Sequence, residues 1–367
     1  MSAGVPEARQ SRHFNNAVHG LRAFAASMVF GVHLCDSFNT YFFPHCELLN
    51  EAMPYIKRFG TFGVELFFVI SGYVIMNSLE RHSLRLFLLR RLVRIYPVFC
   101  FFTVTFFVLN GVLQVHQEGT SLRALLLNLG FLDIYFGTPA LSPNAWSLTF
   151  EANFYLLAGL GCFLLRKHAT LPLVLLGAAA LVFLLHFPIA AYFVIGCLLY
   201  ACRHLQPASL PRVIEFSVFA LWGVLAATVD HEAISVANVA LLAATALFFF
   251  VVTTRNGIMT QIAAWNAVFF IGTISYSFYL THPYAYFPLR LLFQKISLGT
   301  WNIGVAAVVY VLCIGCAAIA ASYCVYRLLE VAPYRAAFGE TVFRRPVRRD
   351  PRAVGVLATA APAIDSR

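Results

Sequence analysis

The sequence predicts an all-α, polytopic membrane protein with about ten transmembrane helices. Its 367 residues are 60% hydrophobic and only 11% charged, and the mean hydropathy is +0.76. A soluble domain of this length needs far more charge to cover its surface. Apolar runs of about 18 residues or more recur from end to end, separated by short clusters of arginine, proline and histidine. Length and continuity of these runs therefore indicate helices that cross a bilayer.

The apolar runs also predict where each helix lies. The expected spans are residues 17–36, 60–79, 93–115, 145–165, 170–186, 188–202, 213–229, 234–252, 266–290 and 302–327. The opening residues are polar and the first apolar run continues for a full crossing, so no cleavable signal peptide is expected. The predicted division is a cytoplasmic N-terminal tail at 1–13, a transmembrane domain at 14–338 and a basic cytoplasmic tail at 339–367.

The distribution of basic residues predicts the orientation. With the N-terminus in the cytoplasm, 21 of the 26 Lys and Arg residues fall in segments on the cytoplasmic side. The positive-inside rule then places both termini in the cytoplasm of an inner (plasma) membrane protein. The net charge of +10 is thus explained by topology and by contact with membrane lipid, and no nucleic acid partner is expected.

Four ionisable residues interrupt the apolar spans: His33, Glu65, Glu151 and His282. Such groups are costly inside a membrane and usually functional. Their positions in the predicted spans place all four in the outer half of the membrane, so we expect them to face one cavity. The alternative for each residue alone is a structural polar group. A metal centre is not expected, because no two of the four share a helix.

Arginines form a second group near the cytoplasmic face. Arg22 lies eleven residues before His33 on the same helical face, roughly 16 Å away along the axis. Arg90, Arg91 and Arg94 are expected around the start of the third span. Guanidinium groups beside a helix N-terminus suit a phosphate. On charge alone, ordinary positive-inside topology explains this cluster better.

Five motifs, in order along nearly the whole chain, resemble the integral membrane acyltransferase family 3, which includes O-antigen, nodulation-factor and macrolide acyltransferases. They are Gly20-Leu21-Arg22 leading to His33, residues 62–72, Arg91-Leu92-Val93-Arg94-Ile95-Tyr96-Pro97, Trp146-Ser147-Leu148 with Glu151, and residues 274–280 with His282-Pro283.

The chain departs from the family pattern at three places. His19 stands where the family usually has aspartate, and Ala152-Asn153 replace the usual Glu-Gln after Glu151. Pro333 follows the motif of residues 326–330 one residue late. Some relatives carry an extra extracytoplasmic hydrolase-like domain, which is not expected here because the sequence ends about forty residues after the last predicted span.

The resemblance implies a membrane-bound O-acyltransferase. The expected reaction moves an acyl group, with acetyl expected, from acyl-CoA to a hydroxyl of a glycan or glycolipid acceptor, with no bound cofactor. His33 would act as general base, with Glu65 or Glu151 orienting its ring. His282 is a further catalytic candidate. The donor phosphates would bind the basic side chains of Arg22, Arg90, Arg91 and Arg94.

A transporter is the alternative from another functional class. In that interpretation the same buried histidine and glutamate side chains form a proton relay for a small polar or acylated solute. Internal inverted repeats would favour it, and none is visible in the sequence.

Overall fold

A computed structural model describes residues 5–113, 121–142, 144–230 and 235–339, with side chains from residue 17 onward. Within these ranges the chain is helical and contains no strand, which confirms the predicted all-α class. The helices are α1 (Val5–Phe42), α2 (Glu47–Thr61), α3 (Gly63–Arg81), α4 (Leu84–Leu113), α5 (Leu122–Leu129), α6 (Trp146–Arg166), α7 (Thr170–His186), α8 (Ala191–Ala201), α9 (Arg212–Thr228), α10 (Val236–Val252), α11 (Ile258–Ile262), α12 (Asn266–Lys295), α13 (Ile303–Val325) and α14 (Ala332–Phe338).

Short helical turns complete these elements. The 3₁₀ turns are η2 (Asp133–Tyr135), η3 (Pro188–Ala190), η4 (Cys202–Leu205) and η5 (Leu298–Thr300), and η6 (Tyr326–Val331) is a π-helical segment between α13 and α14. Every predicted span falls on a helix. The N-terminal tail predicted at 1–13 is helical from Val5, and most of the tail predicted at 339–367 lies outside the described residues.

Length and apolar composition identify the membrane-spanning helices. Six segments of the described chain are long and apolar enough to span, and α7 and α10 are shorter apolar helices of 17 residues. The six are Ala17–Phe42, Glu47–Arg81, Leu84–Val112, Trp146–Arg166, Pro188–Leu205 and Ile303–Phe338. A polytopic helical membrane protein is therefore confirmed, while the number of ten spans stays a prediction.

The main difference from the predicted spans lies at the start of α4. This helix begins at Leu84, nine residues before the predicted start at 93. Arginines lower the hydropathy of residues 84–92, but arginine is a good helix former, so the helix continues through them. Hydropathy measures how apolar a segment is, and it misses helical turns that carry charge.

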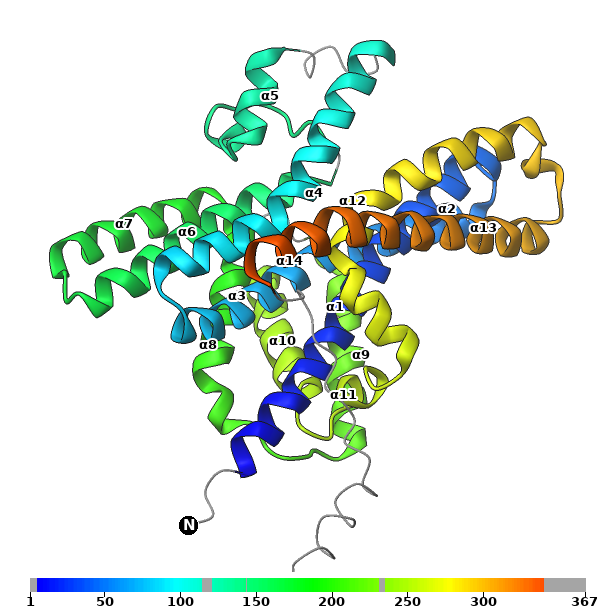
Figure 1. The fold of residues 1–367 in the computed structure, drawn as a ribbon. Coiled ribbons are helices and arrows are strands. Elements are labelled where there is room, and N and C mark those ends of the chain that lie inside the picture. The colour runs from blue at the N-terminus through cyan, green and yellow to red at the C-terminus, as the bar shows by residue number, and fades with distance from the viewer. Residues whose placement is uncertain (1–4, 114–120, 143, 231–234, 340–367) are drawn as a thin grey trace, which may run out of the picture.

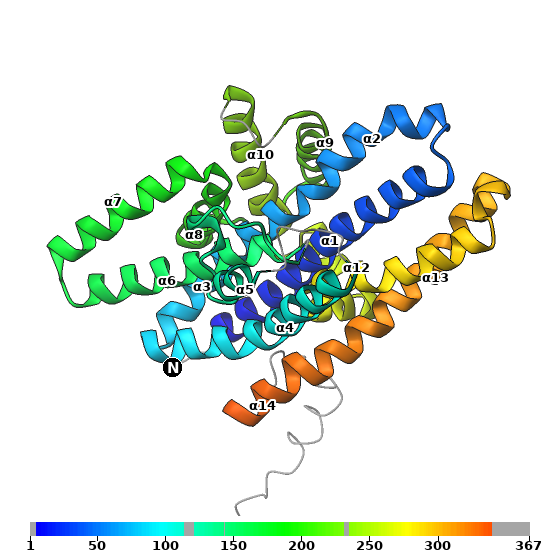
Figure 2. The same cartoon turned by 90° about the horizontal axis from the view of Figure 1, so that it is seen from above.

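Helix α1 lies at the centre of the molecule. Figures 1 and 2 show it passing between α2 and α12, and it also packs against α3 and α11. Helix α13 covers the outer side of α12 (Figure 2). The α6–α7 pair and the α12–α13 pair extend from this centre in opposite directions (Figure 1). The central position of α1 brings its polar residues to the contacts with α3 and α12.

Helices α3 and α8 approach each other most closely. A Cβ atom on Gly72 would lie 2.1 Å from the carbonyl oxygen of Phe193, and one on Gly196 would lie 2.1 Å from that of Val69. Only glycine permits this backbone separation, as in other membrane helices that pack through small residues. This contact holds α3, which carries Glu65 and Ser71, in place.

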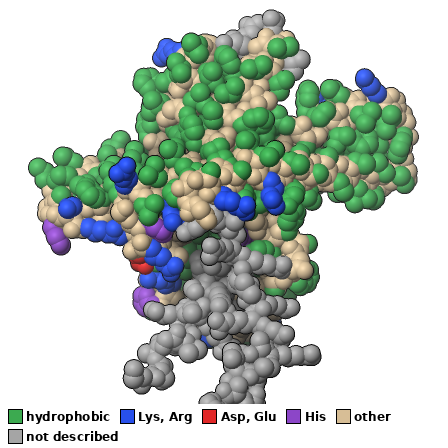
Figure 3. Space-filling view, viewed as in Figure 1, with side chains coloured by type: hydrophobic (Ala, Val, Ile, Leu, Met, Phe, Trp, Pro, Cys, Tyr) green, Lys and Arg blue, Asp and Glu red, His purple; other side chains and the backbone are tan. Residues whose placement is uncertain are grey.

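The surface separates apolar arms from a basic centre. Figure 3 shows hydrophobic side chains over the α6–α7 and α12–α13 arms, while Lys and Arg gather mainly between and beneath them. Helix α7 buries none of its residues although it is almost wholly apolar. An exposed apolar surface of this size is typical of helices in contact with lipid.

Candidate active site

A pocket of about 700 Å³, counted with the solvent space into which it opens, lies where α1, α3, α4, α6 and α12 meet. Its walls hold three arginines against one carboxylate, so the pocket favours an anionic ligand. The lining residues are Arg22, Val64, Phe67, Phe68, Ile70, Ser71, Val74, Arg91, Arg94, Ile95, Ser147, Leu148, Glu151, Tyr155, Tyr276 and Tyr279.

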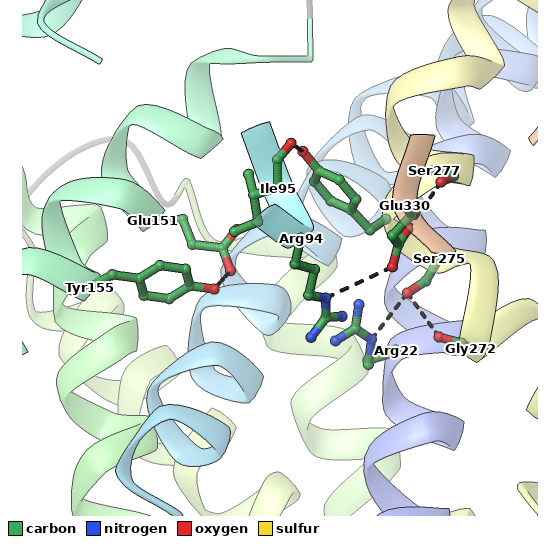
Figure 4. Close-up of polar contacts among 10 residues, drawn as sticks. Arg22, Arg94, Ile95, Glu151, Tyr155, Gly272, Ser275, Ser277 and Glu330 are labelled. Atoms are coloured by element: carbon green, nitrogen blue, oxygen red, sulfur yellow. Dashed lines mark hydrogen bonds and ion pairs between the residues drawn. The ribbon is translucent and has the colours of Figure 1, made fainter. Parts of the chain in front are cut away.

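Arg22 and Arg94 bring two guanidinium groups together in this pocket (Figure 4). The Nε of Arg22 donates to Ser275 Oγ at 3.1 Å, and Ser275 Oγ donates to the carbonyl oxygen of Gly272 at 3.0 Å. Two adjacent positive charges repel each other, and a bound anion relieves that repulsion. The pair is therefore suited to phosphate oxygens.

Glu330 forms an ion pair with Arg94. It is fully buried, lies 3.8 Å from Arg94 Nε through Oε1, and accepts a hydrogen bond from Ser277 Oγ at 3.1 Å through Oε2. Its segment η6 is π-helical, and a π-turn holds one residue more than an α-turn. This matches the position of Pro333 one residue later than in the family motif.

Glu151 belongs to the arginine-lined pocket. Its Oε1 accepts hydrogen bonds from Ser71 Oγ at 2.8 Å and from the Tyr155 hydroxyl (Figure 4). The guanidinium of Arg91 lies over the Tyr155 ring at 5.5 Å and over the Phe87 ring at 5.7 Å. Cation–π contacts of this kind orient Arg91 toward the pocket.

Arg90 lies outside the pocket. Its Nη1 donates to the Tyr334 hydroxyl at 3.3 Å, and its guanidinium lies 5.2 Å from the Phe338 ring centre on α14. Adjacent residues on a helix point about 100° apart, so Arg90 and Arg91 face different neighbours. The predicted helix N-terminus beside Arg90, Arg91 and Arg94 is wrong. Helix α4 begins at Leu84, so the backbone N–H groups of its first turn lie before these arginines.

His33 and His282 form a separate pair, with ring centres 5.3 Å apart. His282 is buried and uses both ring nitrogens: Nδ1 lies 3.1 Å from the Phe278 carbonyl oxygen and Nε2 lies 3.4 Å from Asn144 Nδ2. No hydrogen bond to the His33 ring is found among the described residues. Of the two histidines, His33 therefore has a ring nitrogen available for another group.

Glu65 lies in the first turn of α3, buried at 2% exposure. It lies close enough to Tyr192 and Tyr279 for its carboxyl group to interact electrostatically with their hydroxyl groups. Like the two histidines, it does not line the pocket. Of the four residues predicted to face one cavity, only Glu151 lines this pocket. Equal depth in a membrane does not fix the direction in which a side chain points, so the shared cavity stays a prediction.

Tyr279 connects the two groups. It lines the arginine pocket, and its ring centre lies 6.4 Å from that of His282 and 6.0 Å from that of Phe67. Its hydroxyl lies 3.1 Å from Ser147 Oγ. Sequence reasoning assigned no role to Tyr279, Ser147 or Asn144, although polar residues next to the motif positions were a signal.

Two of the departures from the family pattern have structural roles. Asn153 Nδ2 donates to the Thr149 carbonyl oxygen at 2.8 Å, and its Oδ1 accepts from the Tyr135 hydroxyl at 2.8 Å. His19 packs on Phe269 with ring centres 4.5 Å apart. Cys35 and Cys46, whose pairing the sequence left open, are both free thiols.

Comparisons with known proteins identify the family of the chain. Residues 15–327 match the family model Acyl_transf_3, described as an acyltransferase domain. The chain is 29% identical over 158 residues to the acyltransferase MdmB of Streptomyces mycarofaciens, covering 40% of this chain and 39% of the relative. It is 29% identical over 170 residues to the peptidoglycan O-acetyltransferase OatA of Listeria monocytogenes, covering 41% of this chain and 24% of the relative.

The matched segments thus span well under half the length of either relative. No solved structure matches the chain significantly. The family model, by contrast, covers most of the chain and includes the pocket-lining arginines and both histidines. The family that the five motifs indicated is confirmed, and the chain belongs to the acyltransferase 3 family.

Proposed function

We propose that this protein is a membrane-bound O-acyltransferase that transfers an acyl group, with acetyl expected, from acyl-CoA to a hydroxyl of a glycan or glycolipid. The observation that carries the proposal is the arginine-lined pocket, which Tyr279 and His282 connect to a histidine with a free ring nitrogen, in a chain of an acyltransferase family. The printed names of the two relatives, an acyltransferase and a peptidoglycan O-acetyltransferase, support acyl transfer to a hydroxyl.

The donor would occupy the pocket. Arg22, Arg91 and Arg94 would bind the phosphates of CoA, because guanidinium groups form charge-assisted hydrogen bonds with phosphate oxygens. Glu151 would accept the hydrogen bond of the Tyr155 hydroxyl and so hold the Tyr155 ring at the wall of this pocket. The acyl end would then point past Tyr279 and Phe67 toward His33, which lies roughly 16 Å from Arg22 along α1.

His33 would act as the general base. Its free ring nitrogen takes the proton of the acceptor hydroxyl while the hydroxyl oxygen attacks the thioester carbonyl carbon. The carbon–sulfur bond breaks, the acyl ester forms on the acceptor, and the sulfur of CoA takes the proton back from His33. Glu65 or Glu151, the carboxylates that the sequence proposed for this role, would favour the positive charge that His33 carries in the transition state.

The orientation remains part of the proposal. Both termini would face the cytoplasm of the inner membrane, where acyl-CoA is available, and the acceptor would approach from the other side. The charge bias of the sequence supports this orientation.

Radiolabelled acetyl-CoA tests the proposal directly. Purified protein in lipid nanodiscs is mixed with labelled acetyl-CoA and either glycan fragments or a glycosylated macrolide. Label in the acceptor together with free CoA, lost in His33→Ala, is the expected result. Release of no CoA with any acceptor, combined with uptake of a solute by proteoliposomes, would support the transporter instead.

A further inference from the structure

Asn144 joins the segment before α6 to α12. It is buried at 4% exposure. Its Nδ2 lies 2.9 Å from the carbonyl oxygen of Tyr279 and 3.4 Å from Nε2 of His282. One side chain from a distant part of the sequence therefore contacts both the backbone of α12 and the histidine pair.

The first contact replaces a helical hydrogen bond that the sequence removes. In an α-helix the carbonyl of Tyr279 accepts from the backbone N–H four residues later, which is at position 283. Pro283 has no N–H and cannot donate. Asn144 supplies the missing donor, so the carbonyl oxygen of the pocket-lining Tyr279 keeps a hydrogen-bond partner.

The second contact uses the ring nitrogen of His282 that the Phe278 carbonyl leaves unprotonated. A carbonyl oxygen only accepts, so the Nδ1 that faces Phe278 must carry the proton. Nε2 of the neutral ring is then a lone pair, which accepts from the second amide hydrogen of Asn144. Both hydrogens of one amide are used, one for the Tyr279 carbonyl and one for His282.

We infer that Asn144 is a positioning residue for the histidine pair. It occupies Nε2 of His282, whose Nδ1–H is fixed by the Phe278 carbonyl, and keeps the ring in contact with His33, so that the acceptor hydroxyl finds a free nitrogen on His33 only. This inference rests on the proposed function, in which His33 is the base. Loss of Asn144 would free Nε2 of His282 beside His33, and the two rings would then compete for the same proton.

Pro283 provides a way to separate the two contacts. In Pro283→Ala the helix regains the N–H that serves the Tyr279 carbonyl. The double variant N144A/P283A therefore repairs the helix but still lacks the donor to His282. Kinetics and thermal unfolding are measured for N144A, P283A and N144A/P283A in nanodiscs, with P283A as the matched reference for the double variant.

The expected kinetic result has two parts. N144A/P283A regains the thermal stability that N144A loses, yet its kcat stays about tenfold or more below that of P283A, with the KM for acyl-CoA unchanged. If kcat of the double variant equals that of P283A, Asn144 only caps the helix and the inference is wrong. Wild-type kcat in N144A would also overturn it.

A spectroscopic test does not depend on catalysis. Protein labelled with ¹⁵N in its histidine rings should show one histidine with protonated Nδ1 and unprotonated Nε2, assigned by its absence in His282→Gln. The Nε2 resonance should shift in N144A/P283A, where Nε2 loses its hydrogen bond, and should keep its position in P283A. An unchanged Nε2 resonance in the double variant would contradict the inference. Failure of the wild type to transfer acyl groups would instead refute the proposed function and leave this spectroscopic result valid.

Discussion

The arginine-lined pocket and the histidine pair are built from opposite kinds of chemistry. In the pocket, charged side chains lie around open space, and Arg94 is held at 3.8 Å by the carboxylate of Glu330. In the histidine pair, the His282 ring is held by neutral contacts to a backbone carbonyl and an amide. Charge suits the recognition of phosphate, while a surrounding of low polarity keeps a histidine base unprotonated. We infer that the two regions divide binding of the donor from proton transfer.

Loss of the base should have the largest effect. His33→Ala should lower kcat by about 10²–10⁴-fold, the usual contribution of a general base, with little change in the KM for acyl-CoA. Steady-state kinetics in nanodiscs measure both constants. Wild-type kcat in this variant would remove His33 as the base and move attention to His282.

Loss of a pocket arginine should act on the donor. Arg94→Ala or Arg91→Ala should raise the KM for acyl-CoA about 10- to 100-fold, as expected when a charged hydrogen bond is removed, and leave the acceptor KM nearly unchanged. Lysine should rescue only in part, because a point charge cannot bind two phosphate oxygens at once.

Arg90 is the matched control for these variants. It carries the same charge next to Arg91 in the sequence, yet its side chain contacts Tyr334 and Phe338 outside the pocket. Arg90→Ala should therefore change the donor KM less than about twofold. An equal loss in R90A and R91A would show that the arginines act only through the general charge of the cytoplasmic face.

A smaller effect is expected at Glu330. Glu330→Gln keeps the side-chain shape and a partner for Ser277 but removes the charge that faces Arg94. The donor KM should rise by a few-fold, because Arg94 loses its orientation but keeps its own charge. Unchanged donor affinity in E330Q would mean that Glu330 holds α14 in place and does not position Arg94.

The sequence predicted the helices well because their apolar runs are long and continuous. It missed the charged first turns of α4, where hydropathy falls although the helix continues. The sequence also predicted that Glu151 lies at the same depth as the histidines, since depth along a helix can be counted from sequence. The direction of a side chain depends on how helices pack around it, as Ser71 and Tyr155 show for Glu151. The contact of Asn144 with α12 depends on tertiary packing in the same way.

Donor binding without turnover tests the division of roles most directly. Binding of a non-hydrolysable acetyl-CoA analogue is measured by titration calorimetry for wild type, His33→Ala and Arg94→Ala in nanodiscs. Wild-type affinity in H33A and an affinity about 10- to 100-fold weaker in R94A are expected. Equal weakening in H33A and R94A, or wild-type affinity in R94A, would contradict the division between a charged donor pocket and a neutral histidine pair.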